Sequence, residues 1–164
     1  MKMIAAVVHD REQGYQFESV DLKEPKNDEI LVKIAACGLC HTDEFGRTLL
    51  LKGPLILGHE GAGVVKQVGP LVKDLKVGDH VAFSYASCGH CKNCLSGKPQ
   101  YCENFNAINF GGVAPDGETK ITQNGRPVNM FFGQSAFAQY ATISERSVVK
   151  IDEDVDLAIA APSA

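Results

Sequence analysis

A chain of 164 residues, of which 45% are apolar and 22% charged, is long enough for one domain with a sizeable core and short for two. Its net charge of −4 argues against a basic surface for nucleic acid or an anionic membrane, so we expect neither as a partner. The longest N-terminal apolar run, Ile4 to Val8, is too short for a signal peptide or membrane helix, and we expect a cytoplasmic protein with reduced thiols.

Short segments rich in Val, Ile and Phe predict strands along most of the chain, at residues 2–9, 15–22, 29–36, 63–68, 79–84, 137–143 and 147–151. Helical patterns are predicted over residues 42–49 and 92–96, whereas 104–129 is expected to be a loop because Gly and Pro recur along it. A helical pattern over 156–164 stops midway, which suggests that the polypeptide continues in its parent protein. The sequence predicts one mainly β, barrel-like domain with short helices.

Four cysteines in a C-x2-C-x2-C-x7-C array give the strongest chemical signal: Cys88, Cys91, Cys94 and Cys102. Four thiolates held this close suit a tetrahedral Zn²⁺ and leave no position for a substrate, which describes a structural site. A disulfide framework is the alternative, but consecutive CxxC steps would form strained loops and no secretion signal supports oxidation. A thiol redox protein is a weaker alternative, because cysteines engaged by zinc are poor redox dithiols and no thioredoxin-like βαβ pattern surrounds them.

A second group of possible ligands lies nearer the N-terminus. Cys37, Cys40 and His41 follow one another at the end of a predicted strand, and His59 lies in the sequence GHEG before a glycine-rich strand. A thiolate and an imidazole at two strand ends suit an open zinc site, because fewer than four protein ligands leave a position for water or substrate. On spacing alone, packing in a core explains such residues equally well.

Four motifs occur in the order CGLCHTDEF, LGHEGAGVVKQVG, VGDHVAF and the four-cysteine array. Together they resemble the zinc-dependent medium-chain alcohol dehydrogenases, over the whole chain. The resemblance implies that residues 1–164 form the GroES-like catalytic domain of that family, a partly open β-barrel with a structural-zinc lobe at about 86–104. The later segment FFGQSAFAQYATISER is similar to the aryl- (benzyl-) alcohol dehydrogenase subgroup.

The resemblance implies a second, catalytic zinc. Cys40 and His59 match its thiolate and imidazole ligands, and Glu60 matches a carboxylate that lies behind the metal and can approach it. Asp43 matches the residue that orients the ligand histidine. Cys37 has no metal role in this comparison and is expected to be a small buried residue.

Further residues match positions that handle protons, cofactor and substrate. Thr42 matches the hydroxyl that takes the alcohol proton, and His41 matches a basic position that contacts the cofactor pyrophosphate. Phe45 stands where many members carry a histidine, so the proton path would end at the cofactor ribose, at water or at His41. Phe131 and Phe132 match the substrate pocket, where aromatic rings favour an apolar or aromatic alcohol, although they are also ordinary core residues.

The sequence lacks a nucleotide-binding motif. The nearest match to G-x-G-x-x-G begins at Gly61, lacks the third glycine and leads into a predicted strand, so we reject it. The resemblance implies that NAD or NADP binds to a separate Rossmann domain outside this chain, and that a third cysteine ligand of the catalytic zinc lies there too. We expect the chain alone to hold the structural zinc, to bind neither nucleotide tightly and to oxidise no alcohol.

The predicted function is therefore the catalytic domain of an enzyme that oxidises a primary alcohol to an aldehyde, with hydride transfer to NAD(P). The expected partners are a small alcohol or aldehyde and the missing Rossmann domain. A homo-oligomer is expected for the full enzyme. The alternative, from a different class, is a stand-alone zinc-binding or interaction module derived from this fold.

Overall fold

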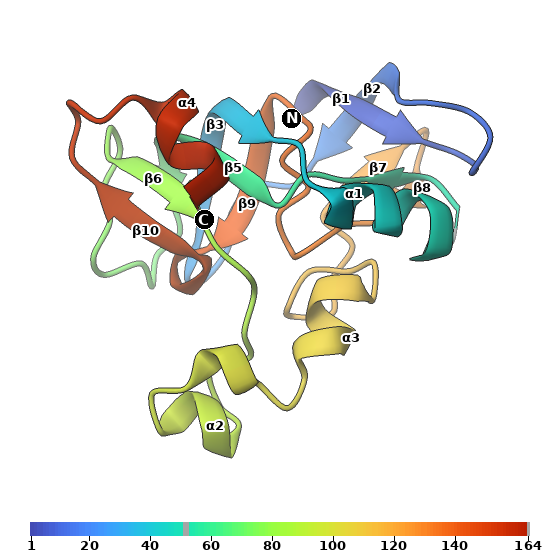
Figure 1. Cartoon of the computed structure of the whole chain (residues 1–164). Helices are drawn as coiled ribbons and strands as arrows, with labels where there is room; N and C mark the ends of the chain where they lie inside the picture. Colours follow the sequence, from blue (N-terminus) through green and yellow to red (C-terminus); the bar gives the residue numbers. More distant parts are fainter. Residues whose placement is uncertain (51–52, 164) are drawn as a thin grey trace.

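Two five-stranded sheets form the frame of the computed structural model, which describes residues 1–50 and 53–163 (Figure 1). The first has the order β4-β1-β2-β7-β8, with β1 at Lys2–Val8, β2 at Gln16–Leu22, β4 at Leu55–Ile56, β7 at Ile121–Gln123 and β8 at Arg126–Val128. The second has the order β10-β6-β5-β3-β9, with β3 at Glu29–Gly38, β5 at Glu60–Val68, β6 at His80–Phe83, β9 at Tyr140–Ser144 and β10 at Val148–Ile151. The ladders between these strands are antiparallel, unlike those of a Rossmann sheet.

Each sheet buries branched apolar side chains on its inner face. Val7 and Val20 pack with Ile56 in the core of the first sheet. Ile30 and Val32 of β3 are fully buried in the core of the second. Because β-branched residues pack well on a pleated surface, these segments are more stable as strands than as helices.

The segment that leads into β9 joins the two sheets. Ala6 N donates to Phe137 O at 2.8 Å, and Ile34 N donates to Gln139 O at 3.0 Å, so the segment bonds to β1 on one side and to β3 on the other. The sheets thereby curl around a shared seam (Figure 1). The prediction of a mainly β, partly open barrel with short helices is confirmed.

The helices are short. They are α1 (His41–Phe45), which continues into a π-helical turn (Gly46–Leu50), α2 (Lys92–Leu95), α3 (Phe105–Phe110) and α4 (Leu157–Ala160). Single 3₁₀ turns cover Pro99–Tyr101, Glu145–Ser147 and Ala161–Ser163. None of the helices in the described part of the chain has the length and apolar character needed to cross a membrane.

The prediction of a loop over 104–129 is wrong, because this stretch contains α3, β7 and β8. Asn124 and Gly125 both have positive φ, +51° and +77°, and they turn the chain between the two strands. An Asn-Gly pair is the usual sequence of such a tight hairpin, so this pair in the sequence could have predicted the hairpin of β7 and β8.

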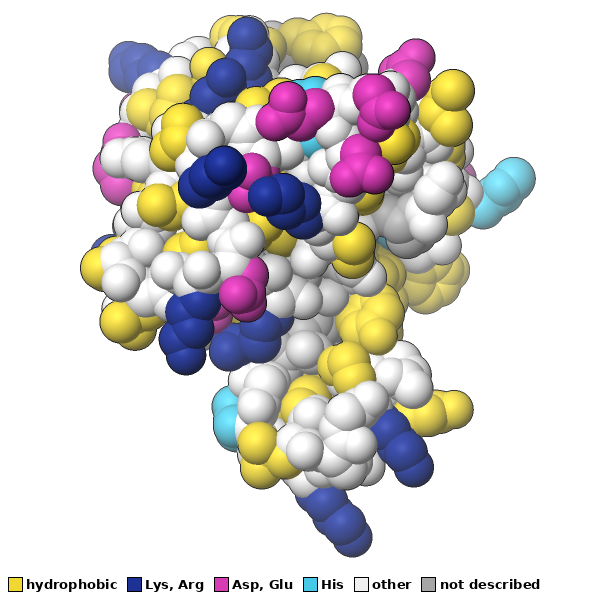
Figure 2. Space-filling model, turned by 90° about the vertical axis from the view of Figure 1, so that its left-hand side faces the viewer, with side chains coloured by type: hydrophobic (Ala, Val, Ile, Leu, Met, Phe, Trp, Pro, Cys, Tyr) yellow, Lys and Arg dark blue, Asp and Glu magenta, His cyan; other side chains and the backbone are white. Residues whose placement is uncertain are grey.

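The part of the chain around α2 and the 3₁₀ turn Pro99–Tyr101 forms a lobe that projects away from both sheets (Figure 1). The space-filling view shows the same projection, below a body on which acidic and basic side chains are interspersed (Figure 2). A buried cation ties the chain after the lobe to β3. Lys120 Nζ lies 2.8 Å from Glu29 Oε1 and 2.7 Å from Asp116 Oδ2, and the lysine side chain has no exposed surface. Burial alone would lower the pKa of Lys120, but these carboxylates outweigh it and raise the pKa.

Candidate metal centres

The four cysteines of the lobe lie together. Their Sγ atoms are all within 4.8 Å of one another, although the residues come from separate turns: Cys88, Cys91, Cys94 and Cys102. Cys91 caps α2, and Cys102 follows the 3₁₀ turn Pro99–Tyr101. All six cysteines of the chain carry free thiols, so the four sulfurs form a cluster of thiols rather than two disulfides.

Backbone amides are directed at these sulfurs. Cys91 N donates to Cys88 Sγ at 3.3 Å, and Cys88 N donates to Cys102 Sγ at 3.4 Å. Burial acts to raise the pKa of Cys88, but backbone N–H groups of His90 and Cys91 outweigh it and lower the pKa to about 6. Burial raises the pKa of Cys94 to about 11. Four sulfurs, some already held as thiolates by amides, fit the donor set of a structural Zn²⁺.

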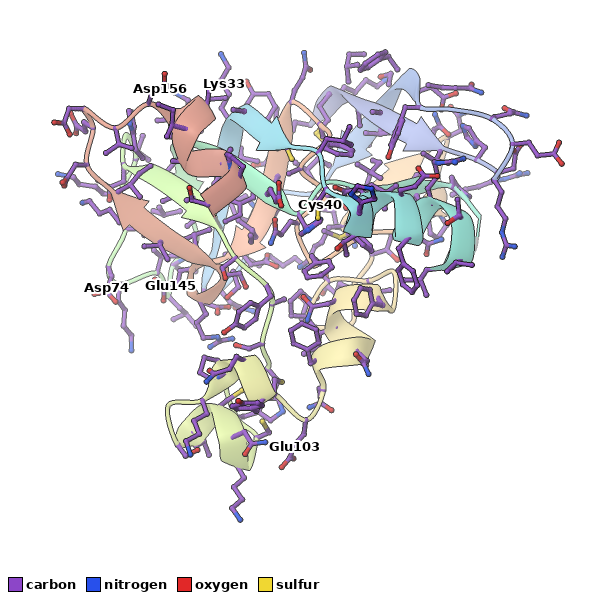
Figure 3. The ribbon with its side chains drawn as sticks, in the orientation of Figure 1. Lys33, Cys40, Asp74, Glu103, Glu145 and Asp156 are labelled. Atoms are coloured by element: carbon purple, nitrogen blue, oxygen red, sulfur yellow. The ribbon has the colours of Figure 1, made fainter. Side chains whose placement is uncertain are left out.

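A second group consists of Cys40, His59 and Glu60, whose ligand atoms also lie within 4.8 Å of one another. Cys40 lies two residues after β3 and caps α1, where Figure 3 labels it. His59 directly precedes β5, and Glu60 is the first residue of that strand. The ends of two neighbouring strands thus bring a thiol, an imidazole and a carboxylate to one point, a donor set that suits Zn²⁺ with an open position.

Asp43 holds both parts of this group in place. Its side chain is fully buried, and its Oδ2 accepts from Cys40 N at 3.0 Å. Its Oδ1 accepts from Gly58 N at 2.9 Å and lies 3.1 Å from His59 Nδ1. Because Nδ1 faces the carboxylate, Nε2 is the nitrogen left for a metal. Burial would lower the pKa of His59, but the Asp43 carboxylate outweighs it and raises the pKa above its ordinary value.

The two cysteines of the CGLC sequence differ in their chemistry. The hydroxyl of Thr42 lies 3.5 Å from Cys40 Sγ and Thr42 N donates to that sulfur at 3.4 Å, and the two contacts lower the pKa of Cys40. Burial raises the pKa of Cys37 to about 12, and its thiol contacts Gly38 O. The thiolate form is therefore favoured more at Cys40 than at Cys37, whose side chain packs against the core of the second sheet.

Aromatic rings surround the imidazole of His59. The ring of Phe132 stacks on it, with centroids 4.7 Å apart and planes at 26°, and the ring of Phe131 meets it edge-on at 5.7 Å. Phe110 of α3 lies against both phenylalanines. The structure thus brings Phe131 and Phe132 to the second group, whereas His41 is exposed at the start of α1.

Two features of this site were not inferred from the sequence. A Cβ atom on Gly38 would collide with Glu60 Oε2, so the absence of a side chain at Gly38 makes room for the carboxylate. Phe110 belongs to the stretch expected to be a loop, and no motif marked it. The glycine of the CGLC sequence was the available signal for the first feature.

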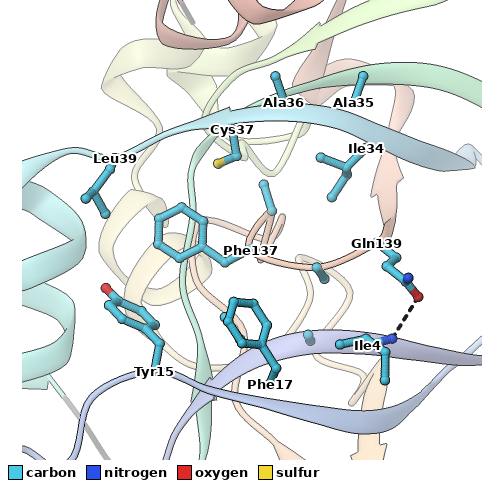
Figure 4. A pocket seen from close by; sticks show the side chains of 14 residues that line it. Ile4, Tyr15, Phe17, Ile34, Ala35, Ala36, Cys37, Leu39, Phe137 and Gln139 are labelled. Carbon is cyan, nitrogen blue, oxygen red and sulfur yellow. Dashed lines mark hydrogen bonds between the residues drawn. The ribbon is translucent and has the colours of Figure 1, made fainter.

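An open apolar groove of about 660 Å³ runs between β1 and β3 beside this site (Figure 4). Tyr15, Phe17, Cys37, Leu39 and Phe137 line it, and Ile4 N donates to Gln139 Oε1 at its edge. The lining includes neither the candidate ligands nor Phe131 and Phe132, the two rings that contact His59. Phe131 instead borders a cavity of about 30 Å³, which is too small for an alcohol with a ring.

Comparison with known proteins gives consistent matches. The family profile of the alcohol dehydrogenase GroES-like domain matches residues 26–153. A geraniol dehydrogenase from Castellaniella defragrans is 44% identical over 148 residues, which are 88% of this chain and 40% of that protein. The crystal structure of an alcohol dehydrogenase zinc-binding domain protein from Burkholderia ambifaria matches with a TM-score of 0.94 and 42% identity, over 99% of this chain and 45% of that one.

A benzyl alcohol dehydrogenase from Acinetobacter calcoaceticus matches with a TM-score of 0.91 and 39% identity, over 99% of this chain and 44% of that one. The chain therefore spans less than half the length of the relatives it matches. These matches to dehydrogenases do not favour the alternative of a stand-alone zinc-binding or interaction module.

Proposed function

Because the chain belongs to the alcohol dehydrogenase GroES-like domain family, we propose that residues 1–164 are the catalytic domain of a zinc-dependent enzyme that oxidises a primary alcohol to an aldehyde with NAD or NADP. The observation that carries the proposal is the grouping of Cys40, His59 and Glu60 around one point, with Asp43 behind the imidazole. The proposed cofactor domain corresponds to the part of the relatives that this chain does not cover.

Residues of this chain would bind the metal and accept the proton of the alcohol hydroxyl. Cys40 and His59 would bind the catalytic zinc, with Glu60 within reach, and Asp43 would keep the His59 ring in the orientation that presents Nε2. When bound, zinc supplies the Lewis acidity that lowers the pKa of an alcohol hydroxyl, and NAD(P) supplies the hydride acceptor. The Thr42 hydroxyl, beside the Cys40 sulfur, would accept the alcohol proton.

The proton needs a route away from Thr42. Phe45 offers no proton acceptor, so the route passes to the cofactor ribose, to water or to His41. His41 is exposed at the first position of α1, where a cationic imidazole would also suit the cofactor pyrophosphate.

The substrate we propose is an apolar primary alcohol, aromatic or allylic in character. Phe132 stacks on His59, so an aromatic ring lies beside the proposed zinc, and the buried Phe131 meets the edge of the same imidazole. The names of the geraniol and benzyl alcohol dehydrogenases support this class. The cysteines of the lobe, in turn, would hold a second zinc with no open position, which stabilises the lobe.

Metal content and activity test the proposal in the chain joined to its proposed cofactor domain. Cys40→Ala is expected to lose about one zinc and nearly all oxidation of benzyl alcohol and geraniol, because the catalytic zinc loses its thiolate. Cys37→Ala is the matched control, since the same motif keeps its proposed ligand, and it should retain both zincs and activity. Undiminished activity in Cys40→Ala, or equal losses in both variants, would refute the assignment.

The lobe is tested separately by Cys91→Ala. This change should release about one zinc and lower the temperature of unfolding, because binding at a structural zinc site contributes folding energy. A variant that keeps both zincs would show that the four cysteines do not bind metal.

A further inference from the structure

Asn109 lies on α3, between the cysteine lobe and the second metal group (Figure 1). Its side chain is fully buried and makes three hydrogen bonds. Oδ1 accepts from Ala86 N at 2.9 Å, and Nδ2 donates to Ala86 O at 2.9 Å and to Phe105 O at 2.8 Å. The amide thus links Ala86, which precedes the lobe in the chain, to α3, which follows the lobe. A buried amide with all of these partners rigidifies its surroundings.

On one side, this helix is joined to the cysteines. Phe105 N, at the start of α3, donates to Cys102 O at 3.0 Å. Ile108 is buried in one cluster with Ala86, Cys91 and Cys102. A change in the spacing of the cysteines, such as metal binding would bring, is therefore transmitted to α3 by direct packing.

On the other side, the helix is joined to the imidazole. Asn109 O accepts from Phe132 N at 2.8 Å, and Phe132 has a φ of +54°, a conformation that costs energy for a bulky residue. The hydrogen bond to the backbone carbonyl of Asn109 helps to hold Phe132 in this strained conformation. The ring so placed stacks on His59.

We propose that Asn109 is a positioning residue that couples the two groups, so that metal in the four-cysteine cluster raises the affinity of the Cys40–His59–Glu60 group for metal. An ordered lobe fixes Ala86 and α3, α3 fixes Phe132, and the Phe132 ring limits the orientations of the His59 imidazole. The coupling is reciprocal, as any linkage between binding sites must be. It rests on the proposed zinc ligands and adds a dependence of one site on the other.

The test is a Co²⁺ titration of the chain joined to its proposed cofactor domain, with the cysteine cluster first filled by Zn²⁺ and binding monitored by the cobalt–thiolate absorbance at the Cys40 group. Asn109→Asp keeps the acceptor for Ala86 N and removes both N–H donors. We expect it to weaken Co²⁺ binding about 5- to 10-fold, at the lower end of typical coupling between sites. Asn93→Asp is the matched control, because the Asn93 amide also bonds a carbonyl of the lobe, Tyr101 O at 2.7 Å, but Asn93 lies on α2 rather than on the helix whose backbone bonds Phe132.

A second variant keeps the proposal testable if Asn109→Asp does not fold. Phe132→Leu removes the stacked ring and leaves the Asn109 amide in place, and it should weaken Co²⁺ binding by a similar factor. If both single variants fold, the double variant should lose little more than either, because both interrupt one route. Wild-type affinity in Asn109→Asp, a loss no larger than in Asn93→Asp, or wild-type affinity in Phe132→Leu would overturn the proposal.

The NMR signals of the His59 ring protons give a readout that needs no second metal. Filling the cysteine cluster with Zn²⁺ should move these signals through the ring current of Phe132, and Asn109→Asp should abolish that movement. If the wild-type chain joined to its proposed cofactor domain binds no Co²⁺ at Cys40, the proposed catalytic zinc is refuted. The His59 signals would still decide the coupling, since equal movement in both proteins would overturn it and movement in wild type alone would support it.

Discussion

Asp43 Oδ1 lies 3.1 Å from His59 Nδ1, and the other oxygen of the same buried carboxylate accepts from the backbone of Cys40. One side chain thus sets the orientation of both proposed zinc ligands. A carboxylate in this position also makes the imidazole more basic, which strengthens it as a ligand and, without metal, favours its protonation.

Asp43→Asn is expected to weaken metal binding at the Cys40–His59–Glu60 group by about 10- to 100-fold, the usual effect of losing a partner of a ligand histidine. In the metal-free chain, the pKa of His59 should fall, because burial still disfavours the imidazolium and the opposing charge is gone. An NMR titration of His59 and a Co²⁺ titration measure the two effects.

The sign of the pH dependence follows from this pKa. Protons compete with metal for His59, and the wild-type imidazole has the higher pKa. When the pH is lowered, the wild-type protein should therefore lose metal affinity at a higher pH than Asp43→Asn does. The control is Glu44→Gln, which removes a neighbouring carboxylate that is exposed and pairs with Arg47. An unchanged His59 pKa in Asp43→Asn would contradict the role of this carboxylate.

Gly38→Ala tests whether the Glu60 carboxylate needs the empty space beside it. The new methyl group would collide with Glu60 Oε2, so the carboxylate must turn away, and the unfolding free energy should change little because this oxygen is the far end of a flexible side chain. Metal binding at the second group should weaken. Gly14→Ala is the control, since a Cβ there would meet no atom, and a Gly38→Ala chain equal to it in metal affinity would disprove the argument.

Thr42→Ala should lower alcohol turnover by about 100-fold or more in the chain joined to its cofactor domain, as expected when a group that takes the proton is lost. Thr42→Ser keeps the hydroxyl beside Cys40 Sγ and should retain most of the activity. Steady-state kinetics with benzyl alcohol measure both variants. Equal turnover in Thr42→Ala and wild type would remove Thr42 from the proton path.

Lys120→Met tests the buried cation that ties the chain after the lobe to β3. Removing Nζ leaves the buried Glu29 carboxylate without its partner at 2.8 Å, and we expect a loss of about 3–5 kcal/mol in unfolding free energy. Lys26→Met is the matched control, because Lys26 also pairs with Glu118 but is exposed, and its loss should change stability little. Urea denaturation measures the unfolding free energy of the two variants. Similar midpoints would contradict the view that losing the buried lysine destabilises the protein more than losing the exposed one.

The sequence predicted the strands whose inner residues are Val and Ile, such as Val32 in β3, because burial and strand propensity agree there. It missed α3, a six-residue helix whose Phe105 and Phe110 are held by the aromatic cluster around Phe132, a tertiary effect that no local pattern contains. Helix prediction over 42–49 located α1 but not the π-helical turn after Phe45.

The candidate site, like the fold, could be predicted from the sequence only in part. Motif order pointed to Cys40 and His59, and the structure brings them together, but their spacing along the chain does not give the distance between two strand ends. The space at Gly38 and the bonds of Asn109 depend on contacts with residues distant in the sequence, and only the three-dimensional structure reveals them.

The seam at residues 137–139 has a consequence for the order in which the chain is made. Ala6 and Ile34 receive their partners Phe137 and Gln139 only after the cysteine lobe and α3 have been synthesised. Until then Ala6 of β1 and the edge of β3 that faces β9 are unpaired, and such edges are where nascent β-proteins aggregate. A lobe that folds locally around metal would already be complete at that time, so the seam would close after the lobe has formed.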